Sequence, residues 1–301
     1  MTQDVGQDTI MLRDGVLVGP VRRSRNTAIN QRGSIHDDAT ASRLGFRGGT
    51  VAGSVHLDLF PPLLLRAFGP RWFERGTLSI NFLNPTVDAE PVRAFLRQPE
   101  IATSADVQVE AWIEREDGLR VGEGTAAVGE PGVPTALGGR DLARYNQGEY
   151  RILRDIHPGD PLGPVQVCYT LAEHRTRMEV ITEQLPWYTA PSPWGGPIVS
   201  PAAMVSLLYN KPVAAIRPRI GQAVGLFGAI ELRNIAGPIF VDREYTVSGT
   251  VLARGQSPKT EYFWYETTLA EPDGHRIAGL LMQLRFMKAS SPLWQETGPA
   301  R

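Results

Sequence analysis

One short segment of the chain gathers side chains that can transfer a proton. His36 is followed directly by Asp37 and Asp38. A histidine can give or take a proton near neutral pH, and a nearby carboxylate can orient its ring and stabilise the imidazolium. The segment therefore holds the parts of an acid/base site, with His36 and Asp38 as candidate catalytic residues. The alternative is that His36 lies in a loop, and that Asp37 and Asp38 are the acids at the start of the next helix.

The residues after this segment predict a helix. Four apolar side chains recur at the four-residue spacing of one buried stripe: Val51, Val55, Leu59 and Leu63. Gly53 and Ser54 form a small-residue helix start. The pair Pro61-Pro62 predicts a kink or a restart, because proline donates no backbone hydrogen bond and crowds the preceding turn. His56 lies on the same turn as Gly53, so it either faces the site or is a packed helix histidine.

The order of elements in the first half recurs in the second. Short β runs follow the first helix at 77–83, 92–96, 107–114 and 120–128, and others follow an apolar helical segment, 202–209, at 229–235, 244–252, 261–269 and 276–287. The turn at Asn84-Pro85 has a counterpart at Gly237-Pro238. We interpret the pattern as a duplication with units at 1–135 and 149–301 and a linker at 136–148. The alternative is a chance succession of two common helix-and-meander units.

Composition limits the classes of function. The 31 basic and 32 acidic residues nearly cancel, so no long-range field favours nucleic acid or an anionic membrane. The apolar runs fall far short of the ~20 residues that span a bilayer, and the acidic N-terminus lacks the basic start of a signal peptide. Cys168 is the only cysteine, which excludes an intramolecular disulfide and a cysteine metal cluster. We therefore expect a cytoplasmic protein that acts on a small molecule.

The sequence predicts no metal and no cofactor. His157, His174 and His275 are scattered along the chain and give no close metal-ligand spacing. The chain also lacks a phosphate-loop lysine motif and a GxGxxG after a strand, which argues against nucleotide and dinucleotide cofactors.

Several of these residues match a known family. The matching positions are Ile35-His36, Asp38, Ala41, the run Leu-Gly-Phe-Arg-Gly at 44–48, Val51-Ala52-Gly53 and the run Ile-Asn-Phe-Leu-Asn-Pro-Thr at 80–86. Together they resemble the hydratase segment of MaoC-like proteins, the R-specific enoyl-CoA hydratases and dehydratases. With the duplication, the resemblance spans most of the chain. It implies an α+β double hotdog, in which antiparallel sheets wrap two long central helices and pair edge to edge.

The resemblance also implies roles for single residues. In the family, an aspartate and a histidine activate a water that adds across an enoyl thioester, and a backbone N–H at the helix start binds the oxyanion. His36 matches the histidine, Gly53 and Ser54 match the donor, and Gln31 stands in place of the aspartate. A glutamine amide can hold water by hydrogen bonds, but it cannot act as a base. His36 is then the only obvious base.

The second copy lacks a histidine–aspartate pair at the matching place and reads as the degenerate half. It offers Trp187, Tyr188 and Trp194, which we expect to lend an aromatic wall to the pocket. The alternative is that these rings belong to the core.

Three functions are compatible with this pattern. The first is a lyase that hydrates or dehydrates an enoyl or 3-hydroxyacyl thioester, on CoA or a carrier protein, or a specialised variant that performs another enolate reaction. The second is a hotdog thioesterase. The third is a non-catalytic acyl-binding or structural subunit. A homodimer is compatible with all three, and fold alone does not choose between them.

Overall fold

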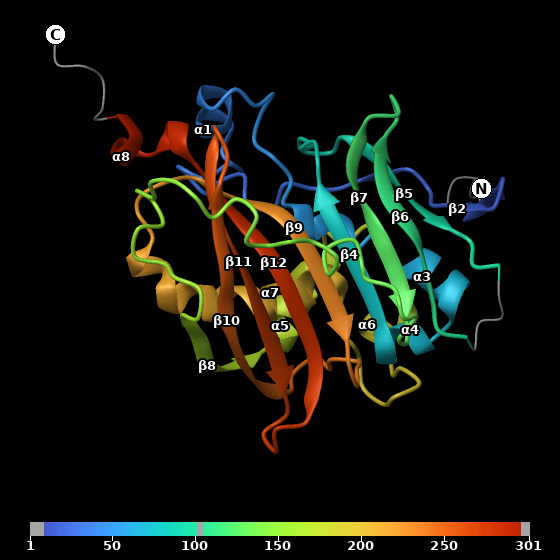
Figure 1. The fold of residues 1–301 in the computed structure, drawn as a ribbon. Coiled ribbons are helices and arrows are strands. Elements are labelled where there is room, and N and C mark those ends of the chain that lie inside the picture. The colour runs from blue at the N-terminus through green and yellow to red at the C-terminus, as the bar shows by residue number, and fades with distance from the viewer. Residues whose placement is uncertain (1–8, 101–104, 296–301) are drawn as a thin grey trace, which may run out of the picture.

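A single antiparallel sheet forms one layer of the protein, and most of the helices lie against one of its faces. The computed structural model describes residues 9–100 and 105–295. Figure 1 shows α7 and α5 behind the strands of the second half and α3 behind those of the first half. The main hydrophobic core fills the space between this layer of helices and the sheet, and it includes Phe60, Leu64 and Phe263.

The first half supplies seven strands and four short helices. They are β1 (Met11–Arg13), β2 (Val16–Val18), β3 (Arg22–Arg23), α1 (Asp38–Arg43), α2 (Gly53–Leu57), α3 (Pro61–Phe68), α4 (Arg71–Arg75), β4 (Gly76–Phe82), β5 (Pro91–Arg97), β6 (Val107–Arg115) and β7 (Arg120–Val128). The four longer strands confirm the β runs that alternating apolar residues predict. The three N-terminal strands were not predicted, because two or three residues carry too little pattern.

The second half repeats this order with longer elements. They are β8 (Pro161–Cys168), α5 (Leu171–Met178), α6 (Pro186–Thr189), α7 (Pro201–Ile216), η2 (Arg217–Arg219), β9 (Gly225–Asn234), β10 (Glu244–Gln256), β11 (Thr260–Ala270), β12 (Arg276–Met287), η3 (Lys288–Ser290) and α8 (Pro292–Gln295). The predicted strands are again confirmed. Strand β8 was not predicted, and α5, the polar helix that contains His174, begins with a capping box formed by Thr170 and Glu173.

The two halves meet in the middle of the sheet. The strand order is β1-β2-β5-β6-β7-β4-β9-β12-β11-β10-β8, with β3 also paired to β5. Strand β4 pairs with β9 in antiparallel register from Thr77–Arg233 to Asn81–Ala229. This pairing removes two exposed strand edges and confirms that the sheets join edge to edge.

The central helix of the first half is divided. Helix α2 ends at Leu57, and α3 begins at Pro61 with Pro61 and Pro62 in its first turn. Proline suits that turn because the backbone N–H groups there have no partner within the helix. The restart at Pro61-Pro62 is therefore confirmed. The expectation of two long central helices is wrong for the first half, because only α7 runs unbroken for 16 residues.

The segment 136–148, the expected linker, contains no helix or strand. In Figure 1 it is the green coil segment that crosses the face of the sheet opposite α7. Leu137 is buried, and its amide donates to Ser79 Oγ at 3.1 Å. A second, smaller apolar cluster around Leu137 and Trp264 lies beneath this crossing. None of the helices within 9–100 and 105–295 is long and apolar enough to cross a membrane.

Candidate active site

A cavity of about 700 Å³ lies between the two halves. The first half lines it with residues 31–36, 50–53 and 82–86, and the second half lines it with the C-terminal part of α7 and with residues 223–227. Its volume falls in the range of pockets that bury a drug-sized ligand. The cavity contains His36, Gln31, Gly53 and His56 in its wall, so the fold brings together four of the residues that the sequence singled out.

A single hydrogen bond fixes the His36 ring. Its Nδ1 lies 2.7 Å from the carbonyl oxygen of Thr50. A carbonyl can only accept, so Nδ1 carries the hydrogen and donates it. Nε2 has no hydrogen-bond partner among the described residues, and in the neutral ring it is unprotonated. His36 is half-buried and is therefore available as a base at the cavity wall.

Close packing of two segments holds this ring in place. The side-chain amide of Asn26 donates to the His36 carbonyl at 2.8 Å, and the backbone amide of Thr50 donates to the Ile35 carbonyl at 3.0 Å. A Cβ on Gly49 would lie 2.1 Å from the His36 carbonyl oxygen, so only glycine allows the two segments to approach so closely.

The two aspartates after His36 have structural roles. Asp37 caps α1 by accepting from the Thr40 amide and hydroxyl, and the hydroxyl bond is the main reason that the pKa of Asp37 is lowered. Asp38 accepts from the Gly49 amide at 2.7 Å. Neither carboxylate lines the cavity, and within the described chain none hydrogen-bonds the His36 ring. The structure thus corrects the catalytic assignment of Asp38, because Thr50 orients the ring instead.

Gln31 lines the same cavity as His36 and is exposed. Its main-chain carbonyl accepts from the Ser34 hydroxyl at 2.7 Å, which closes the turn that leads to His36. The glutamine therefore lies in the position where a polar side chain could contact a molecule in the cavity.

The starts of α2 and α7 differ. Ala52 gives α2 no side-chain cap, and the amides of Gly53 and Ser54 have no acceptor among the described residues. At α7, the Ala202 amide donates to the Asp58 carboxylate at 2.8 Å, and the Ser200 hydroxyl accepts from Ala203. Of these two helix starts, as far as the described residues show, that of α2 leaves donors for a ligand and that of α7 does not.

Glycine is required at position 53 for a packing reason. A Cβ there would lie 2.8 Å from the ring of Phe82, which belongs to β4. Gly53 lets the helix start pack against that ring while its amide lies in the wall of the cavity.

His56 and Thr86 form a buried pair in the same wall. His56 Nε2 lies 2.7 Å from Thr86 Oγ1, and both residues are almost fully buried. Burial lowers the pKa of His56 to about 4, so its ring is neutral near pH 7. Both alternatives predicted for His56 therefore apply, since it is packed in the helix and also lines the cavity.

The neutral His56 predicts a pH-dependent stability. Its pKa is about 4 when folded and near 6.5 when unfolded, so between these values the unfolded chain binds more protons. The free energy of unfolding should therefore fall by up to about 3 kcal/mol as the pH drops through this window. The free energy of unfolding is measured by urea titration at several pH values. In His56→Gln it should no longer fall through this pH window. His275→Gln, at an exposed histidine, should retain this pH dependence. The same pH dependence in the parent and in both variants would contradict the assignment.

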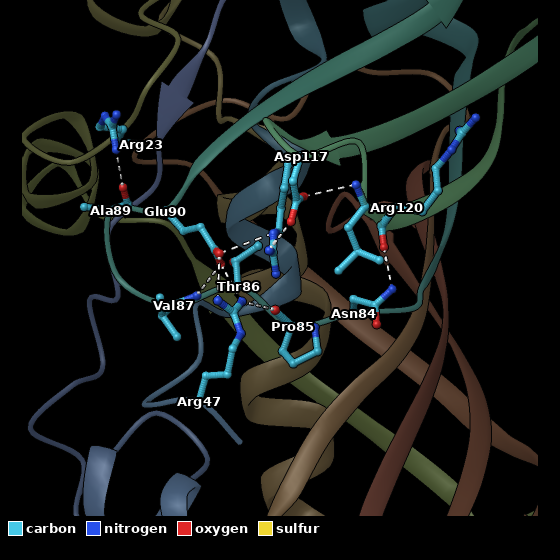
Figure 2. A network of polar contacts seen from close by, with 12 residues as sticks. Arg23, Arg47, Asn84, Pro85, Thr86, Val87, Ala89, Glu90, Asp117 and Arg120 are labelled. Carbon is cyan, nitrogen blue, oxygen red and sulfur yellow. Dashed lines mark hydrogen bonds and ion pairs between the residues drawn. The ribbon is translucent and has the colours of Figure 1, made fainter. Parts of the chain in front are cut away.

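The turn that carries Thr86 is fixed by a charged network (Figure 2). Glu90 accepts from Arg47 at 2.9 and 2.8 Å and from the Val87 amide at 3.1 Å, and Arg115 lies 3.3 Å away. Burial alone would raise the pKa of Glu90, but the bonds from Arg47 and Val87 hold it below its usual value. Glu90 therefore stays ionised and anchors the turn at 84–90.

The aromatic residues of the second half lie elsewhere. Trp187 and Trp194 pack against Phe73, with ring centroids 5.7 and 5.9 Å away, and Trp194 donates to Glu74. Tyr188 is fully buried. None of the three predicted aromatics lines the His36 cavity. The expected aromatic wall is corrected, because two of these rings pack against Phe73 and the third is buried, and Tyr209 and Phe227 line the cavity instead.

No group of three His, Cys, Asp or Glu side chains in the described part of the chain is placed to hold a metal ion. The polar groups in the cavity wall include His36, the Gly53 amide, Gln31 and Thr86.

Two units of helix and sheet, joined through neighbouring edge strands with a cavity between them, define a double hotdog fold. No protein-family model matches the sequence, and no curated protein matches it either. Solved structures do share its fold. A MaoC domain protein from Chloroflexus aurantiacus, described as a dehydratase, is 12% identical, with a TM-score of 0.62 over 95% of this chain and 99% of that chain.

Two further structures agree with this result. A conserved hypothetical protein from Mycobacterium tuberculosis with a double hotdog fold is 10% identical, with a TM-score of 0.59 over 94% of this chain and 97% of its own. A MaoC-like dehydratase is 13% identical, with a TM-score of 0.53 over 94% and 99%. The chain therefore has the fold of MaoC-like dehydratases and double hotdog proteins.

Proposed function

We propose that this chain is a hydratase or dehydratase that acts on an enoyl or 3-hydroxyacyl thioester at His36. The observation that carries the proposal is the His36 ring, whose Nδ1 is held by Thr50 while Nε2 is left as a base in the cavity wall. The shared fold adds support, since two of the similar structures are described as dehydratases.

The geometry suits proton transfer to and from a water. His36 Nε2 takes a proton from the water as its oxygen bonds to the β-carbon of the enoyl thioester. The electrons move to the thioester oxygen, and the amide of Gly53, which lies in the cavity wall, stabilises the negative charge. The imidazolium then returns its proton to the α-carbon. Dehydration is the same sequence in reverse, with the 3-hydroxyl leaving as water.

In this scheme Gln31 serves as a neutral hydrogen-bonding group. Its amide can hold the water beside His36, but the proton goes to His36 alone. The substrate is an acyl thioester of CoA or of a carrier protein.

An enoyl thioester assay tests the function. The purified chain is incubated with crotonyl-CoA and longer enoyl-CoA thioesters, and both the enoyl absorbance and free thiol are followed. Loss of absorbance without thiol release is the expected result. Release of thiol would point to a thioesterase, and no change in either signal with any thioester would favour a non-catalytic acyl-binding chain.

Replacing Gln31 by aspartate tests the missing carboxylate. A carboxylate beside His36 can accept a proton, so Gln31→Asp should raise hydration of simple enoyl-CoA thioesters by at least about 10-fold. Gln31→Asn is the matched control, because it has the size of aspartate without the charge. A fall in activity in Gln31→Asp on every thioester would mean that the glutamine serves another enolate reaction, such as an isomerisation.

A further inference from the structure

We propose that the Thr86 hydroxyl, held by His56, donates a hydrogen bond to the 3-hydroxyl of the bound substrate, or to the water that forms it. Thr86 would then be a catalytic residue, and His56 a positioning residue that acts through it. The inference rests on the proposed function and adds a second contact to the reacting oxygen besides His36.

The backbone places Thr86 next to the base. Its carbonyl accepts from the Val51 amide at 2.9 Å, and Val51 directly follows Thr50, whose carbonyl holds the His36 ring. Thr86 and His36 are thus fixed to neighbouring residues of one backbone segment. Both line the same cavity.

The state of the His56 ring decides which way the Thr86 hydroxyl points. His56 Nδ1 is buried and has no hydrogen-bond partner in the described part of the chain. A buried N–H without an acceptor is rarer than a buried lone pair without a donor. The hydrogen of the neutral ring is therefore on Nε2, and Nε2 donates it to Thr86 Oγ1 across 2.7 Å.

A hydroxyl that accepts from His56 still has its own hydrogen to donate. Within residues 9–100 and 105–295, no protein acceptor for the Thr86 hydroxyl is found. The nearby carboxylate of Glu90 is occupied by Arg47 and the Val87 amide, as Figure 2 shows. Because Thr86 lines the cavity, a ligand oxygen there is the acceptor that remains.

The 3-hydroxyl is the substrate oxygen best suited to this donor. In dehydration it leaves as water, taking a proton from the His36 imidazolium. A hydrogen bond from Thr86 to the same oxygen stabilises the charge that develops on it as the bond to carbon breaks. In hydration the same bond orients the attacking water. The Thr86–His56 pair would therefore supply a polar contact on the side of the cavity formed by α2 and the turn after β4.

Kinetics of two variants at Thr86 and two at His56 test the catalytic role. Thr86→Val keeps the shape and removes the hydroxyl, and it should lower kcat about 10-fold with a smaller change in KM. Thr86→Ser keeps the hydroxyl and should stay within about threefold of the parent. His56→Leu should resemble Thr86→Val in kcat, whereas His56→Gln, which can still donate to Thr86, should recover part of the loss. Equal losses in Thr86→Val and Thr86→Ser, or no loss in either, would overturn the proposal.

A binding experiment separates this inference from the proposed function. In the His36→Ala background, where turnover is strongly reduced, affinities for 3-hydroxybutyryl-CoA and butyryl-CoA are compared by calorimetry. We expect a preference for the hydroxylated ligand that Thr86→Ser retains and Thr86→Val reduces about 10-fold. An equal preference in both variants would overturn the inference even if hydratase activity is found. Loss of the preference only in Thr86→Val would support the inference about Thr86 even if the chain catalyses a reaction other than hydration.

Discussion

Replacing His36 by alanine is expected to lower hydratase turnover by roughly 10²–10⁴-fold, the range for a positioned acid/base group. The reason is the fixed tautomer, since Nδ1 donates to the Thr50 carbonyl and leaves Nε2 as the base. In the described part of the chain no carboxylate contacts the ring, and Gln31 cannot accept the proton. The substrate is held by the rest of a 700 Å³ cavity, so its affinity should change much less than kcat.

A second substitution separates chemistry from structure. His36→Asn can still donate to the Thr50 carbonyl from its amide nitrogen, but it cannot act as a base at neutral pH. It should therefore lose turnover as His36→Ala does while it retains stability. His157→Ala, at an exposed histidine outside the cavity, is the matched control and should remain active. Unchanged turnover in His36→Ala would remove the acid/base assignment and favour a non-catalytic chain or a site in the second half.

Local signals in the sequence predicted the elements that carry the site. The restart at Pro61-Pro62 follows from the chemistry of proline alone. The helix starts near Gly53 and Pro201 and eight of the nine described strands of seven or more residues follow from small-residue and alternating patterns, which neighbouring residues determine; β8 is the exception.

The partners of single side chains could not be predicted in this way. Asp38 is adjacent in sequence to a catalytic candidate, but its carboxylate binds Gly49 because the chain folds back at that point. Tyr209 and Phe227 line the cavity from the other half of the chain, and their pattern is that of ordinary core residues. Thr86 could have been noticed, since it ends the run at 80–86 that resembles the family. Its pairing with His56 depends on how the turn packs against α2.

The partners of Asp58 could not be predicted from the sequence either, and its replacement has the largest expected effect on stability. It lies between α2 and α3 among buried apolar residues, and it is 1% exposed. Its carboxylate accepts from Arg177 Nε at 3.0 Å, from the Ser200 hydroxyl at 3.2 Å and from the Ala202 amide. Arg177 lies 119 residues away in the chain, so no local pattern could have revealed the pair. One carboxylate thus joins the two halves and closes the start of α7.

Replacing Asp58 by leucine is expected to lower the free energy of unfolding by about 3–5 kcal/mol. The substitution leaves the Arg177 charge buried without its partner and the Ala202 amide without its acceptor. Asp58→Asn should lose less, because its amide oxygen can still accept from Ala202. Urea unfolding, followed by far-UV circular dichroism, measures these differences. Glu130→Gln, at an exposed ion pair with Arg75, is the matched control and should cost at most about 1 kcal/mol.

The double variant Asp58→Leu/Arg177→Leu identifies the cause of the loss. If the uncompensated charge dominates, removing Arg177 as well should recover stability relative to Asp58→Leu alone, because the buried cation is gone. If the cap of α7 dominates, the double variant should be no more stable than the single one, since the Ala202 amide stays unpaired in both. A value for Asp58→Leu within about 1 kcal/mol of the parent would contradict both causes.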